Sequence, residues 1–142
     1  MNRKHVHIYK KRMKATAIIM LIIGILYGMY ISRTTYQIEV PQLKKIKSIV
    51  LIQKKTIQEL TDQDAIADIA ALLKGKKTQQ ESINNTPFNV SQKIRLEFHS
   101  KYGDITFIYL YKKDNQYYIE EPYNGIYQMS EDEYNSITRY LR

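Results

Sequence analysis

Residues 15–32 read ATAIIMLIIGILYGMYIS, a run of 18 residues without a charge between Lys14 and Arg33. A helix rises about 1.5 Å per residue, so this run would reach about 27 Å and just cross the hydrocarbon core of a bilayer. The sequence therefore predicts four segments: a basic cytoplasmic tail (1–14), a transmembrane helix (15–32), a juxtamembrane connector (33–45) and one extracytoplasmic domain (46–142).

The net charge of +8 is concentrated around this apolar run. Residues 1–33 contain seven Lys and Arg and no acidic residue, whereas residues 34–142 contain 15 basic and 14 acidic residues. Lys and Arg mark the cytoplasmic side of a spanning helix, and most of these charges precede the run. We therefore expect a single-pass protein of the cell membrane with its N-terminus inside. A nucleic-acid partner is not expected, because its basic patch would lie in the folded part.

A cleaved signal peptide is the alternative to a permanent anchor. Its apolar core is shorter and ends in small residues, whereas this run ends in Tyr30, Ile31 and Ser32. The anchor is therefore favoured. Gly24 and Gly28 form a G-x-x-x-G pattern, which allows two helices to approach closely and predicts a homodimer through the membrane helix. Glycines at this spacing also occur in helices that do not associate, so both interpretations stay open.

The remaining chain predicts an α+β fold. Residues 46–53 and 56–60 read as strands, followed by an amphipathic helix that Thr61 caps and Gly75 ends. A long polar loop follows (76–91). The later segments read as four strands (92–99, 104–111, 116–121, 126–129), with Ser130 and Glu133 forming a capping box for a last helix. We expect an antiparallel sheet of about four to six strands covered by one or two helices.

Few residues could carry catalysis. The chain has no cysteine, which removes disulfides, cysteine zinc sites and cysteine nucleophiles. His99 is the only histidine after the apolar run, and the adjacent Glu120 and Glu121 would point to opposite faces of a strand. The phosphate- and dinucleotide-binding motifs are also missing. We therefore expect no catalytic residue, metal or cofactor. A small cell-wall hydrolase that uses His99 with a nearby carboxylate is the less favoured alternative.

Tyrosines gather in residues 117–127, YYIEEPYNGIY. Tyrosine is a good recognition residue because it buries a large area and keeps a polar tip. The candidate partner-binding residues are Tyr117, Tyr118, Glu120, Glu121, Tyr123, Asn124 and Tyr127. Alternatively, alternate tyrosines cover the sheet against the helices. The predicted function is non-enzymatic binding of a protein or peptide at the outer face. A ligand-sensing or immunity-like protective protein is the alternative.

Three stretches together resemble a known family: ESINN-x-P-x-NV (Glu81–Val90), I-x-L-E-F (Ile94–Phe98) and the segment Tyr117–Ile137. They are similar to an uncharacterised family of small extracytoplasmic domains of low-GC Gram-positive bacteria, which follow a lipoprotein signal or a single membrane helix. The resemblance implies the same location for this domain. The chain lacks the lipidated cysteine, so its helix would provide the anchor. The resemblance implies no activity and no functional residue.

Overall fold

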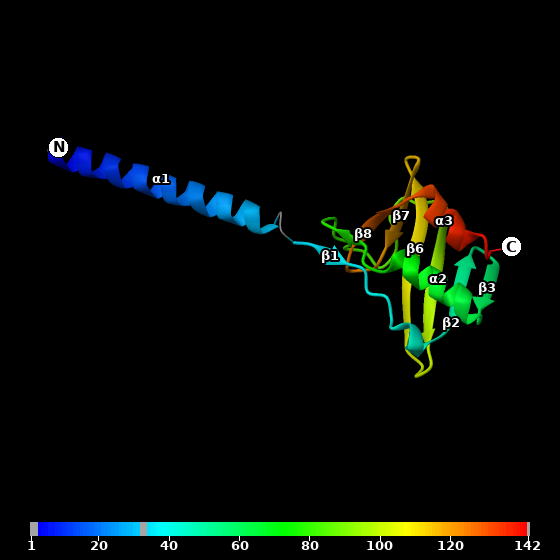
Figure 1. The fold of residues 1–142 in the computed structure, drawn as a ribbon. Helices are drawn as coiled ribbons and strands as arrows, with labels where there is room; N and C mark the ends of the chain where they lie inside the picture. Colours follow the sequence, from blue (N-terminus) through cyan, green and yellow to red (C-terminus); the bar gives the residue numbers. More distant parts are fainter. Residues whose placement is uncertain (1–2, 32–33, 142) are drawn as a thin grey trace. The chain divides into compact units, whose positions relative to one another are not determined.

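The computed structural model describes residues 3–31 and 34–141, and the chain forms two compact units that meet at Thr34 and Thr35. In the first unit a single helix, α1 (Arg3–Ile31), runs through the basic tail and most of the apolar run (Figure 1). The side chains of residues 3–12, 15 and 31 are not among those described.

The predicted membrane helix lies in this first unit. Within the part of the chain that the structure describes, no helix has both the length and the apolar content that a bilayer crossing needs. The predicted segment 15–32 ends at Ser32, which lies outside the described residues. Gly24 and Gly28 are exposed, and apart from the adjacent residues and the backbone of the same helix no described atom lies within 4 Å of a Cβ built on either glycine.

The second unit is built on a six-stranded antiparallel sheet in the order β3-β2-β5-β6-β7-β8. Its strands are β2 (Ile46–Gln53), β3 (Thr56–Leu60), β5 (Lys93–Ser100), β6 (Ile105–Lys113), β7 (Gln116–Glu120) and β8 (Ile126–Met129). The helices α2 (Gln63–Leu73) and α3 (Glu131–Thr138) lie across one face of this sheet (Figure 1). The predicted α+β class is confirmed.

The core lies between these helices and the sheet. Alternation along β5 buries Ile94, Leu96 and Phe98, while the residues between them are half-buried on the other face. Helix α2 covers them with an apolar stripe that includes Ile66 and Ile69, which are fully buried. The face of the sheet opposite the helices therefore carries the polar positions of β5, Lys93, Arg95, Glu97 and His99.

Both helix starts have capping residues. Asp62, rather than the expected Thr61, caps α2, because its carboxylate accepts the N–H of Ala65 at 3.1 Å. The capping box at α3 is confirmed, since Ser130 and Glu133 exchange both of its hydrogen bonds.

The predicted loop 76–91 contains more structure than the sequence indicates. Strand β4 (Lys77–Thr78) lies inside it and pairs with β1 (Tyr36–Gln37), which precedes the short 3-10 helix η1 (Leu43–Lys45). A strand of two residues has no periodicity, so this pairing leaves no pattern in the sequence.

Candidate functional site

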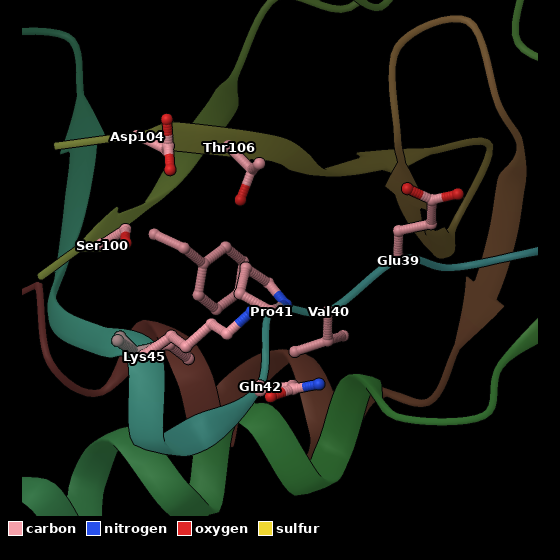
Figure 2. Close-up of a pocket in the computed structure, with 10 residues that line it drawn as sticks. Glu39, Val40, Pro41, Gln42, Lys45, Ser100, Asp104 and Thr106 are labelled. Carbon is pink, nitrogen blue, oxygen red and sulfur yellow. The ribbon is translucent and has the colours of Figure 1, made fainter. Parts of the chain in front are cut away.

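A hollow of about 300 Å³ lies where the segment before β2 meets the β5–β6 hairpin. Figure 2 shows Asp104 and Thr106 on one side of it and Lys45 on the other. Its floor includes the buried side chains of Ile46 and Phe98. The rim carries two acids, Glu39 and Asp104, and one base, Lys45, around an apolar floor. Figure 2 shows the two carboxylates at opposite ends of the hollow, so they are not placed as a pair for acid–base chemistry, and the arrangement suits surface contact.

A second pocket, of about 250 Å³, lies on the sheet face opposite the helices. The residues after β4 form its outer wall, and two backbone hydrogen bonds hold them against the β7–β8 connection. Ser82 donates its N–H to the carbonyl of Asn124 at 3.2 Å, and Ile126 donates to Gln80 at 2.9 Å. Glu81 also forms an isolated bridge with Gly125. The long loop of the sequence therefore becomes part of a site.

A buried carboxylate lies at the base of this pocket. Glu120 is only 2% exposed, and both of its oxygens accept hydrogen bonds from neutral hydroxyl groups. Ser82 Oγ donates to Oε1 at 2.7 Å, and the Tyr111 hydroxyl donates to Oε2 at 3.1 Å. Burial, followed by the charge of Glu120, raises the pKa of Tyr111 above its ordinary value of 10.0. The Tyr111 hydroxyl therefore keeps its proton and remains a donor.

Three aromatic residues line the same pocket as this carboxylate. Tyr111 and Tyr118 stack with their ring centroids 5.5 Å apart and an angle of 27° between the planes. Phe88, from the loop, is 73% exposed although it lines the same pocket. The full lining is Gln80, Asn84, Phe88, Tyr111, Lys113, Asp114, Tyr118, Glu120 and Ile126. We refer to these nine residues as the Glu120 pocket.

The seven predicted binding residues do not form one exposed surface. Tyr118 and Glu120 line the Glu120 pocket, while Tyr117 and Tyr127 belong to the other face of the sheet. Tyr117 contacts Tyr134 of α3 at 4.7 Å between centroids. Tyr127 is 1% exposed in the core. The alternation of the strands separates neighbouring residues in this way.

The other three predicted residues lie in the turn between β7 and β8. Asn124 donates to the carbonyl of Gln37 at 2.9 Å and to the carboxylate of Glu121 at 2.6 Å. Glu121 also accepts the N–H of Glu39 at 3.0 Å. The side chains of Glu121 and Asn124 therefore hold residues 37–39, at the start of the second unit, against this turn. Tyr123 is 69% exposed and is free to contact a partner.

Most of the site escaped the sequence analysis, which proposed only Tyr118 and Glu120 among the nine pocket residues and did not propose Ser82, the hydrogen-bond partner of Glu120. The sequence indicated only that a loop of this length is often functional. Ser82 resembles any loop serine, and its contact with Glu120 spans 38 residues of chain. No local pattern could have revealed it.

His99, the residue of the hydrolase alternative, is close to a carboxylate. Its Nε2 lies 2.9 Å from Glu97 Oε2, and Glu97 also contacts Arg95 at 2.9 Å. Ser48 is opposite His99 in the β2–β5 register but is only 1% exposed, so a substrate would not reach it. Within residues 3–31 and 34–141, no group of three His, Asp or Glu could hold a metal ion.

Comparisons with known proteins agree with this architecture. No curated protein matches the sequence. A solved structure described as "NMR structure of the protein from Ruminococcus gnavus", from a Firmicute, is similar at a TM-score of 0.58 and 25% identity. The similarity covers 68% of this chain and 97% of that one. The model of the family DUF5301, described as "Domain of unknown function (DUF5300)", matches residues 34–128. The chain therefore belongs to the DUF5301 family.

Proposed function

We propose that this protein is a non-enzymatic binding domain anchored in the cell membrane, which recognises a protein or peptide partner outside the cell. The observation that carries the proposal is the Glu120 pocket. A loop distant in sequence brings the exposed Phe88 into the same pocket as the stacked pair Tyr111 and Tyr118. Aromatic side chains around a recess are typical of binding sites, because they bury large areas at a low entropy cost.

The membrane location is supported by the sequence of the first unit. Its uncharged run of 18 residues follows a segment with six basic and no acidic residues. This order favours an inside N-terminus and an outside domain. Gly24 and Gly28 would be the contact if two copies pair in the membrane.

Photo-crosslinking in intact cells tests the binding function. A photo-reactive residue replaces Tyr118, in the Glu120 pocket, or Tyr123, in the adjacent turn. We expect one discrete crosslinked species from at least one of these sites, to be identified by mass spectrometry. Tyr102 provides a matched control, because it is 77% exposed and lies in the β5–β6 turn. Labelling without any discrete product at Tyr118 and Tyr123, in a folded domain, would contradict the proposal.

Sensing of a small ligand is a second candidate, and the size of the pocket favours it. A volume of about 250 Å³ holds one side chain or a small molecule rather than a folded segment. In that case the two crosslinking sites would give no protein product, while a small ligand would still stabilise the domain against heat.

A further inference from the structure

The carboxylate of Glu120 is buried without a cation. None of the ion pairs formed by the described residues includes it. Its two hydrogen bonds come from Ser82 and Tyr111, which carry no charge. Burying an ionised group is costly unless an opposite charge accompanies it. A cation that entered the pocket would therefore supply the opposite charge that this carboxylate lacks within the fold.

The carboxylate also has acceptor capacity left. An ionised carboxylate offers about four acceptor positions, and each oxygen of Glu120 has one hydrogen bond. Glu120 also lines the pocket, so a ligand that enters it can approach this carboxylate. The preferred ligand therefore carries several N–H donors on one positive group.

The walls of the pocket suit the same kind of ligand. The faces of aromatic rings attract cations, and Tyr111, Tyr118 and Phe88 line the same pocket as the carboxylate. Lys113 and Asp114 also line the pocket, and their formal charges cancel. Among the residues that line the pocket, Glu120 therefore determines the net formal charge. Lys113 is exposed and forms no ion pair with Glu120, so it leaves the position open.

We propose that the Glu120 pocket binds a primary ammonium group on an alkyl stem, with the stem between the aromatic rings and the ammonium against Glu120. A primary ammonium has three N–H donors, whereas a quaternary ammonium has none. The source is a lysine side chain of the partner or a free aliphatic amine. This proposal rests on the proposed binding function and names the chemistry that the site recognises.

Titration followed by NMR tests it on the full chain in detergent micelles. The probes are n-butylammonium chloride and N-acetyl-lysine methylamide, with tetramethylammonium chloride and sodium chloride at equal ionic strength. We expect the two primary amines to cause saturable shifts at Tyr111, Tyr118 and the amides of residues 80–88. Tetramethylammonium should bind at least about tenfold more weakly, because it makes no hydrogen bond to the carboxylate. Tighter binding of the lysine probe indicates a peptide source, and equal binding indicates a free amine.

Two variants locate the site. Glu120→Gln should weaken amine binding about tenfold or more, because it removes the charge and keeps the shape. Phe88→Ala should weaken it about threefold through the lost ring contact. Phe88 is largely exposed, so its removal keeps the test valid if Glu120→Gln does not fold. Tyr102→Ala, which removes an exposed ring elsewhere, should leave binding unchanged.

Three results would overturn the proposal: no saturable shift with either amine, equal shifts with all four salts, or unchanged binding in Phe88→Ala. Failure here is separable from failure of the binding function. A crosslink at Tyr118 without amine binding would remove the ammonium proposal and leave the binding function standing. Amine binding without any crosslinked protein would support the ammonium site and contradict a protein partner.

Discussion

Two tyrosine hydroxyls lie on opposite faces of the sheet in opposite environments. The Tyr111 hydroxyl donates to Glu120 at 3.1 Å. The Tyr127 hydroxyl is buried among the described residues without a hydrogen-bond partner. Burial, followed by the charges of Glu121 and Glu39, raises the pKa of Tyr127, so this hydroxyl stays neutral. A buried polar group without a partner lowers stability, whereas a paired one does not.

Replacing each hydroxyl should therefore have effects of opposite sign. Tyr127→Phe should raise the free energy of unfolding by about 1 kcal/mol, because it removes an unpaired polar atom from the core. Tyr111→Phe should lower it by about 1 to 2 kcal/mol, because it takes a donor from a buried carboxylate. Urea denaturation followed by circular dichroism measures both. A loss of stability in Tyr127→Phe would show that its hydroxyl has a partner, such as a buried water.

The same residues show how far the sequence predicts the site. Alternation along 117–127 correctly indicates that neighbouring tyrosines separate, and Tyr117 and Tyr127 do cover the helix-facing side. The same alternation cannot indicate that Glu120 is buried on the opposite face, because the group that contacts its carboxylate is Ser82, in a loop distant in sequence. Burial of a polar residue depends on which segments meet in the folded unit. That information is absent from local spacing.

The β6–β7 hairpin is an element whose turn determines its register. Lys113 pairs with Gln116, which leaves a two-residue turn, and both turn residues have positive φ (50° at Asp114 and 60° at Asn115). Such turns suit the twist of the strands and favour asparagine or glycine. Asn115→Ala should lower the free energy of unfolding by about 1 kcal/mol, because a β-carbon opposes this backbone conformation. Asn115→Gly should stay within about 0.5 kcal/mol of the parent. Equal losses in both variants, measured by urea denaturation, would contradict a left-handed residue at this position.

Helix α3 carries a charge pair that makes its stability depend on pH. Burial alone would raise the pKa of Glu133. Hydrogen bonds from Lys76, at 2.7 Å, and from the N–H of Ser130 outweigh burial and hold the pKa below its ordinary value of 4.5. The fold therefore favours the ionised form. The resulting stability is fully present above pH 4.5 and is lost as the pH falls through the lowered pKa.

Glu133→Gln isolates this charge effect, because glutamine can still accept the capping-box hydrogen bond. At pH 7 it should cost about 1 kcal/mol of unfolding free energy, and the cost should shrink as the pH falls into the acid range. Ser130→Ala is the control. It removes a neutral cap and should cost about 1 kcal/mol with little dependence on pH. If Glu133→Gln lowers the free energy of unfolding equally at pH 7 and in the acid range, the ion pair is not the cause of the loss.

The elements differ in how well the sequence predicts them. The bounds of β2 and β3 agree with the predicted segments 46–53 and 56–60, because a run of branched apolar residues and the turn that follows it are both local signals. The pairing of β1 with β4 joins segments about 40 residues apart and has no such signal. The cap of α2 differs by one residue, since Thr61 and Asp62 are both good capping residues and only the fold selects between them.

At the scale of the whole molecule, charge divides the chain into two parts. The first 33 residues carry seven basic residues and no acid, while the remainder is nearly neutral at 15 basic and 14 acidic residues. The compact second unit begins at Thr35 and contains both pockets. A compact domain that follows a basic and then apolar segment fits the proposed display at a membrane surface.

The absence of native cysteine makes the proposed orientation directly measurable. Two single-cysteine variants, His5→Cys in the basic tail and Tyr102→Cys in the exposed β5–β6 turn, are treated in intact cells with a maleimide that does not cross membranes. We expect labelling of Tyr102→Cys alone, because the positive charges hold the tail inside. Detergent lysis should then make His5→Cys reactive, which is the control for accessibility.

Labelling of His5→Cys alone in intact cells would show that the orientation is the reverse of the one proposed. Loss of residue 5 from the mature protein would show that the apolar segment is a cleaved signal rather than an anchor.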